Sequence, residues 1–97
     1  MVARLTTAED NVRLAVRRAY LLWRRQGEEL RLAETMVRQA EENLTETRSR
    51  VENGVALNEE LLEAQARLLD ARLSLNAART GRRVALEELK RQLGREL

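Results

Sequence analysis

An apolar seam that repeats at heptad spacing is the feature that most constrains how this chain can fold. From Val12, alternating steps of four and three residues reach an apolar or small residue almost every time, over about six heptads, as far as Val51. The members of this seam are Val12, Val16, Ala19, Trp23, Gln26, Leu30, Ala33, Val37, Ala40, Leu44, Thr47 and Val51. Such spacing predicts a long α-helix that packs in a left-handed coiled coil.

A second seam of the same kind follows after residue 56. Its members are Leu57, Leu61, Ala64, Leu68, Ala71, Leu75, Ala78, Arg82, Ala85 and Leu89. Both seams alternate large residues with small ones, an arrangement that lets two helices approach closely while their side chains interdigitate. Two such seams in one chain predict two helices that pack on each other.

Capping signals indicate where these helices begin and end. Thr6 and Glu9 have the spacing of a capping box at the start of a helix. Gly54, after Asn53, suits the left-handed conformation that often ends a helix. Asn58 can cap the second helix, because its side-chain oxygen can accept a hydrogen bond from a free backbone N–H.

The expected fold is all-α, a long antiparallel two-helix coiled-coil hairpin. We expect helices over about 7–53 and 58–95, and a connection this short makes neighbouring helices antiparallel. Residues 1–97 then form a single helical hairpin.

Further apolar residues lie beside the two seams. They are Ala8, Ala15, Leu22 and Met36 in the first expected helix and Leu62, Leu69 and Leu73 in the second. One neighbouring helix cannot cover apolar faces of this width. We therefore expect the hairpin to self-associate through these faces or to pack within a larger protein.

Residue types that are absent make several classes of function improbable. The chain has no Cys and no His, which removes disulfides, thiolate zinc sites and the commonest nucleophile–base pairs. Adjacent carboxylates such as Glu59 and Glu60 point in different directions on a helix. We expect no enzymatic activity, no cofactor and no metal site. The longest apolar run, Ala19 to Trp23, is too short to cross a bilayer, and we expect no signal peptide in this chain.

Charge is distributed unevenly along the chain, although its net value is only +2. Acidic residues concentrate in 41–63 and basic residues in both flanks, so a hairpin becomes a rod with one acidic tip. Basic residues at the other end could follow phosphates, but their spacing spreads them around the helices, so we expect no nucleic-acid binding. They are Arg13, Arg17, Arg18, Arg24, Arg25, Arg79, Arg82, Arg83, Lys90 and Arg91.

An ordered set of motifs between Glu9 and Gly94 resembles one repeat of the TolC-like outer-membrane efflux proteins. The motifs are Val12-Arg-Leu-Ala-Val16, Ala19-Tyr20, Ala33, Ala40, Asn43-Leu44, Arg50-Val-Glu-Asn-Gly54, Leu61-Leu62-Glu63-Ala64, Ala85-Leu86, Leu89 and Leu93-Gly94. The resemblance implies a periplasmic hairpin of an outer-membrane channel, part of the α-barrel tunnel of a tripartite efflux or type I secretion system. The family's β-strands and second repeat are missing, so the chain resembles one excised hairpin that does not itself insert into the membrane.

The resemblance also implies that the glycine turn is the end that docks the hairpin of a periplasmic adaptor (membrane fusion) protein. Three consecutive apolar residues in this turn support an interaction surface, because a connection is usually polar. The expected partner-binding residues are Asn53, Gly54, Val55, Ala56, Leu57 and Asn58, with an acidic entrance formed by Glu52, Glu59 and Glu60. Two positions depart from the family, which usually has an aromatic residue at Val51 and Asp at Glu60.

Two other functions remain open at this point. The hairpin of the periplasmic adaptor itself is also an antiparallel coiled coil, and its tip typically carries Arg, Leu and Ser. Here Arg50 precedes the turn, but no Leu-Ser pair follows Gly54. The other alternative is a plain structural or dimerisation coiled coil, with or without a basic nucleic-acid-binding end. A salt titration with DNA would test for such an end, because phosphate contacts make affinity strongly dependent on salt.

Overall fold

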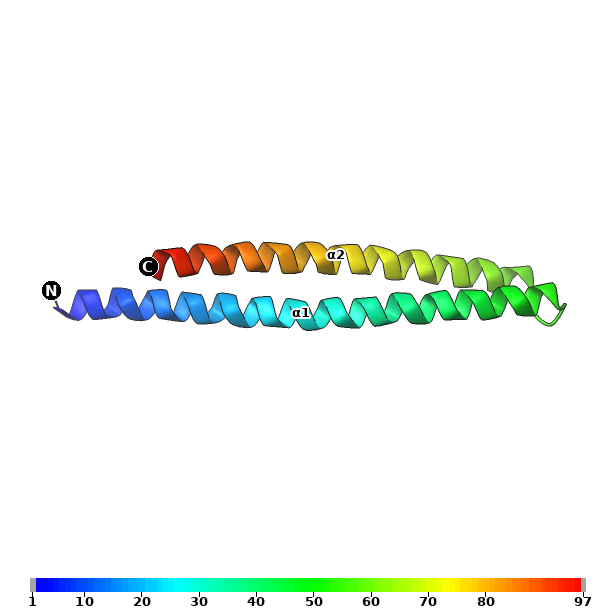
Figure 1. Ribbon diagram of the computed structural model, residues 1–97, viewed down its shortest axis with the longest axis horizontal. Helices are drawn as coiled ribbons and strands as arrows, with labels where there is room; N and C mark the ends of the chain where they lie inside the picture. The colour runs from blue at the N-terminus through cyan, green and yellow to red at the C-terminus, as the bar shows by residue number, and fades with distance from the viewer. Residues whose placement is uncertain (1, 97) are drawn as a thin grey trace.

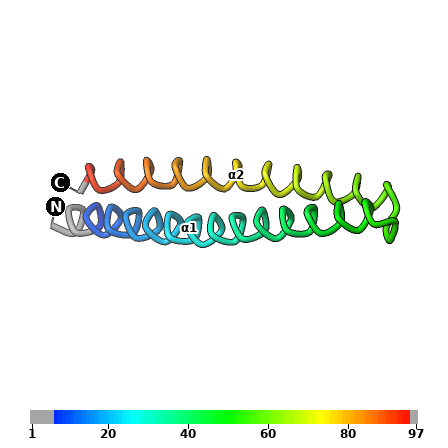
Figure 2. Tube along the Cα trace, turned by 45° about the vertical axis from the view of Figure 1, so that its right-hand side comes forward, coloured from blue at the N-terminus to red at the C-terminus, as the bar shows by residue number. Residues whose placement is uncertain are grey.

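The computed structural model is a narrow rod of two helices (Figure 1). α1 comprises Val2–Glu52 and α2 comprises Asn58–Glu96. The structure describes residues 2–96 and the side chains of residues 7–95, and residues 2–96 contain no β-strand. The rod measures 79 × 16 × 13 Å along its principal axes. The two helices run antiparallel, side by side, in both views (Figures 1 and 2), so the predicted hairpin is confirmed.

α1 begins earlier than the sequence indicated. The helix starts at Val2 and continues through Thr6, so the expected start at residue 7 is wrong. A capping residue needs a non-helical backbone. The residues before Thr6 are Ala3, Arg4 and Leu5, which are strong helix formers. The side chain of Thr6 lies outside the described residues. At the other end of the chain, α2 reaches Glu96, close to the expected end at residue 95.

The two predicted seams form the contact between the helices. Every seam position of α1 is buried or half-buried, and all those within α2 except Arg82 are as well. Small residues account for much of the buried set, which lets the helix axes approach closely. The buried residues are Ala19, Ala33, Thr47, Ala64, Leu68, Ala71, Leu75, Ala85 and Leu89.

Two residues of the second predicted seam are exposed. Leu57 precedes α2 and is 66% exposed, because the chain has not yet entered the helix at this point. Arg82 is exposed, and its guanidinium carbon lies 5.8 Å from the centre of the Trp23 ring. This distance is within the range of a cation–π contact. A charged residue therefore covers the seam at Trp23 instead of filling it.

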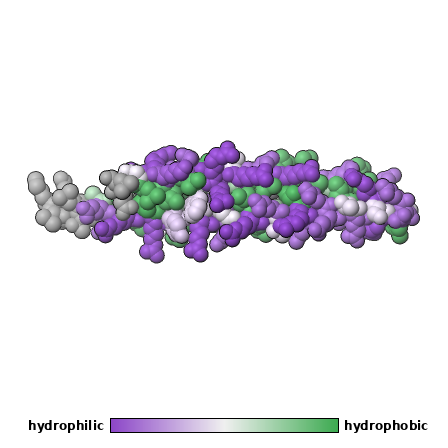
Figure 3. Space-filling view, in the orientation of Figure 1, coloured by the Kyte–Doolittle hydropathy of each residue, from purple (hydrophilic) through white to green (hydrophobic). Residues whose placement is uncertain are grey.

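Of the apolar residues beside the seams, all except the half-buried Ala15 remain exposed in the single hairpin. Leu22 and Met36 in α1 and Leu62, Leu69 and Leu73 in α2 all face solvent. Figure 3 shows apolar patches between hydrophilic side chains along one long side of the rod. Across the described side chains, no large residue is completely buried. The hairpin has a seam but no enclosed core, so the predicted width of its apolar faces is confirmed.

The described helices contain no stretch that is both long and apolar enough to cross a membrane. α1 and α2 interrupt their apolar residues with charged ones throughout.

The two glycines within the helices have different surroundings. α1 passes through Gly27 and α2 through Gly81 without a break. A Cβ atom at Gly27 would lie 3.9 Å from Arg82 Nε, which is an ordinary contact. A Cβ at Gly81 would lie 2.8 Å from Gln26 Oε1, so that flexible side chain would have to move. Gly27 is thus a locally weak helical position and not a site of close helix approach.

We expect Gly27→Ala to raise the free energy of unfolding by about 1 kcal/mol, because alanine favours the helix by that amount and its methyl group fits. Gly54→Ala is expected to lower it by about 1–2 kcal/mol, because φ at Gly54 is +73° and a Cβ atom disfavours this region. Urea unfolding followed by circular dichroism measures both changes. Destabilisation by Gly27→Ala would show that α1 needs a glycine at this height.

Candidate partner-binding tip

The turn after α1 is a well-formed helix C-terminus. Gly54 has φ +73°, in the left-handed region that glycine adopts without steric cost. The Gly54 N–H donates to the Val51 carbonyl at 3.0 Å, and the Val55 N–H donates to the Arg50 carbonyl at 2.8 Å. These two bonds are those of a Schellman motif. They satisfy carbonyls that the end of α1 would otherwise leave unpaired, so the predicted role of Gly54 in ending the helix is confirmed.

α2 begins differently from the sequence expectation. Asn58 is the first residue of the helix, so Leu57 occupies the capping position. The Glu60 N–H donates to the Leu57 backbone carbonyl at 3.0 Å. Within the described part of the chain, no backbone N–H donates to the Asn58 side chain, and the expected capping role of Asn58 is wrong. Glu59 and Glu60 do lie in the first turn, where the helix dipole favours negative charge.

The end of the rod presents apolar side chains to solvent. Val55 is 69% exposed and Leu57 is 66% exposed, whereas Ala56 between them is half-buried. Val55 and Leu57 therefore contribute little to the packing of the hairpin, and Leu57 does not close its end. Exposed apolar groups surrounded by polar ones are a common feature of interaction surfaces.

The acidic residues of the tip do not share one environment. An Arg50 Nη atom lies 3.7 Å from a Glu60 carboxylate oxygen, in a partly exposed ion pair that joins the two helices. Glu52 and Glu59 are exposed, and within the described residues neither carboxylate belongs to an ion pair. The predicted acidic surface thus consists mainly of Glu52 and Glu59, because Arg50 offsets the charge of Glu60.

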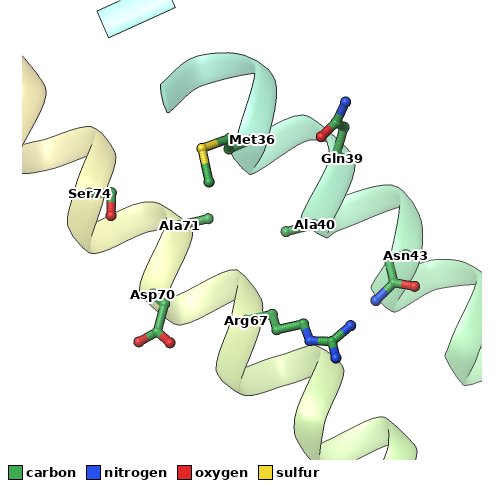
Figure 4. Close-up of a pocket in the computed structure, with 8 residues that line it drawn as sticks. All are labelled: Met36, Gln39, Ala40, Asn43, Arg67, Asp70, Ala71 and Ser74. Carbon is green, nitrogen blue, oxygen red and sulfur yellow. The ribbon is translucent and has the colours of Figure 1, made fainter. Parts of the chain in front are cut away.

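A hollow in the side of the rod was not predicted from the sequence. Ala40 of α1 faces Ala71 of α2, and Figure 4 shows their methyl groups pointing toward each other across the gap. Two small residues at the same height leave a hollow of about 450 Å³. Its lining residues are Met36, Gln39, Ala40, Asn43, Arg67, Asp70, Ala71 and Ser74. Both alanines are seam residues, but heptad spacing alone does not show that they meet.

The tip and the side hollow both offer apolar contact area beside polar groups. Among the side chains that the structure describes, no three His, Cys, Asp or Glu residues come close enough together to hold a metal ion. The tip combines apolar contact area with carboxylates, and the hollow combines a methionine and two alanines with polar side chains at its rim. Both arrangements suit contact with another protein.

The sequence matches the profile of one known protein family. The profile is described as outer membrane efflux protein, and the match covers residues 1–95. No curated protein and no solved structure gives a significant match to the chain.

Proposed function

Because the chain belongs to the outer membrane efflux protein family, we propose that its hairpin forms part of the wall of a periplasmic α-barrel tunnel. In this proposal the tip docks the hairpin of a periplasmic adaptor protein in a tripartite efflux or type I secretion system. The family consists of outer-membrane channels that have periplasmic helical parts. These channels are not enzymes. The observation that carries the proposal is the exposed apolar tip of the hairpin. The chain that forms it belongs to a family of channel proteins.

The side chains of the tip support adaptor docking. Val55 and Leu57 project from the turn with most of their surface in solvent, so a partner could cover them without rearranging the hairpin. Burying a valine or leucine side chain completely contributes about 1.5–3 kcal/mol. Glu52 and Glu59 beside them would attract a basic adaptor tip and favour one orientation over another.

The long sides of the rod support a wall built from several hairpins. Leu22 and Met36 on α1 and Leu62, Leu69 and Leu73 on α2 need cover that one hairpin does not supply. The hollow between Ala40 and Ala71 can receive an apolar side chain of a neighbour, in the way that knobs fill holes between helices. Self-association through these faces is thus part of the proposed function.

The tip is tested by Val55→Asp and Leu57→Asp in a pull-down with the hairpin of the cognate adaptor. We expect each variant to keep the helicity and melting temperature of the original protein, because both side chains are exposed. We expect adaptor binding to weaken by about tenfold or more, since each change replaces apolar contact by a charge that must be desolvated.

Val84→Asp is the matched control, because Val84 is 63% exposed but lies in the half of α2 remote from the tip. It should leave adaptor binding unchanged. Intact binding by both tip variants, or unfolding of the hairpin by either of them, would make the turn a structural cap and refute the docking role.

A further inference from the structure

Arginine side chains gather around Trp23 on one long side of the rod. Two hollows there share Trp23 and Arg82. The smaller hollow, of about 120 Å³, is also lined by Arg24, Gly27, Glu28 and Arg31. The larger hollow, of about 340 Å³, is also lined by Leu30, Arg79, Arg83 and Leu86. We call this surface the basic face and define it by Arg24, Arg31, Arg79, Arg82 and Arg83.

The basic face and the hollow between Ala40 and Ala71 lie on opposite long sides of the hairpin. Arg24 and Gly27 each follow a seam position of α1, whereas Met36 and Asn43 each precede one. Successive residues of a helix are about 100° apart, so these two pairs flank opposite sides of the seam. The sequence spacing predicted that the basic residues are spread around the helices, but the pairing of α1 with α2 brings four of them, together with Arg31, to one side.

Among the side chains that the structure describes, no carboxylate forms an ion pair with an arginine of the basic face. The ion pairs among the described residues involve Arg25, Arg50, Arg72, Lys90 and Arg91, and none involves the basic face. Glu28 is the one acidic residue that lines either hollow. Positive groups held close together repel one another, so an anion bound between them would be stabilised.

The floor of the basic face is apolar. Trp23, Leu30 and Leu86 are half-buried and line the larger hollow. Arg82 lies over the Trp23 ring, and the ring of Tyr20 is 6.1 Å from that of Trp23. A ligand with only a charge would leave this floor in water, and a ligand with only an apolar body would leave the guanidinium groups without partners.

We propose that the basic face is a binding site for amphipathic anions, which carry a phosphate or similar acidic group on an aliphatic or aromatic body. The planar guanidinium group can donate two parallel hydrogen bonds to such an oxyanion, while the body packs on Trp23, Leu30 and Leu86. The larger hollow is near the lower end of the usual size range of ligand sites, about 300–1,000 Å³. A role for these anions as cargo of the channel rests on the proposed tunnel function. Their binding does not, because a single hairpin contains the whole site.

Trp23 is the single tryptophan of the chain, so its fluorescence reports on this site directly. The probe is octyl phosphate below its critical micelle concentration, compared with octyl glucoside, octyltrimethylammonium and inorganic phosphate. We expect octyl phosphate to shift the Trp23 emission at a concentration about tenfold lower than any of the other three, because it alone satisfies both parts of the site. Isothermal titration calorimetry gives the affinity independently.

The double variant Arg79→Gln, Arg83→Gln is expected to weaken octyl phosphate binding by about tenfold or more. The matched control is Arg18→Gln, Arg25→Gln, which removes the same charge. Arg18 and Arg25 each precede a seam position and thus lie on the side of α1 away from the basic face. The control should bind octyl phosphate as the original protein does. Circular dichroism confirms that both variants keep their helices.

Several results would overturn the proposal. An equal response to octyl glucoside would make the hollow a non-specific apolar surface, and an equal loss in the control variant would make the effect one of net charge. Binding of a DNA duplex or of phosphatidylglycerol vesicles without binding of monomeric octyl phosphate would assign the face to a polyanion or a membrane instead. The Val55→Asp variant should bind octyl phosphate normally, so failure of adaptor docking and failure of this site are separable.

Discussion

Leu68→Asp is expected to abolish cooperative folding of the hairpin. Leu68 is 7% exposed and lies in the seam between the helices, where a carboxylate would be buried. The nearby Arg72 already forms an ion pair with Glu41 at the rim of the seam. Removing a buried leucine side chain costs about 2–5 kcal/mol, and burying an unpaired charge adds to this cost. A thin seam without an enclosed core has little stability to lose. Circular dichroism at 25 °C and urea unfolding should show a chain that is largely unfolded.

Leu69→Asp is the control, since it makes the same substitution one residue further along α2. Leu69 is 59% exposed in the hairpin, so a charge there remains in water. The variant should keep its helicity at low micromolar concentration. Retained folding of Leu68→Asp, or equal loss in both variants, would show that the seam does not hold the two helices together.

We expect the original chain to self-associate and the triple variant Leu62→Gln, Leu69→Gln, Leu73→Gln to be a monomer. The three leucines are exposed and are spaced so that they form one stripe on α2. Each buried leucine contributes about 1.5–3 kcal/mol, so losing three should weaken association by at least about a hundredfold. Sedimentation equilibrium at tens of micromolar should give 11.2 kDa for the variant and a larger mass for the original protein.

The control is the helicity of the triple variant, which should equal that of the original protein because none of the three leucines contributes to the seam. A variant that unfolds would mean that these side chains stabilise the single hairpin. A strictly monomeric original protein that melts cooperatively would contradict self-association and would leave the exposed leucines to a different partner.

Local signals predicted the helix ends less well than periodicity predicted the helices. Thr6 and Asn58 both have capping chemistry, yet α1 continues through Thr6 and α2 begins with Asn58 already helical. A single cap contributes about 1 kcal/mol, and favourable helix formers on either side can outweigh it. Gly54 was predicted correctly, because the left-handed conformation at the turn strongly favours a residue without Cβ.

The turn itself was less predictable than the helices. Consecutive apolar residues there indicated an interaction surface, which stays a prediction, and the structure leaves Val55 and Leu57 exposed. The sequence did not show that Ala56 is half-buried or that Arg50 lies against Glu60. Both facts depend on how the chain reverses direction, and no heptad pattern extends through the turn.

The sequence by itself determined which face of each helix is buried, because apolar residues at heptad spacing can be covered only if that face meets another helix. The tertiary structure decided which residues of α1 and α2 lie at the same height. A heptad pattern looks the same after one helix slides along the other by seven residues, so periodicity carries no information about this alignment. The turn at Gly54 sets the alignment of the two helices. That alignment brings Ala40 opposite Ala71 and Arg82 over Trp23. The side hollow and the basic face exist only because of that alignment.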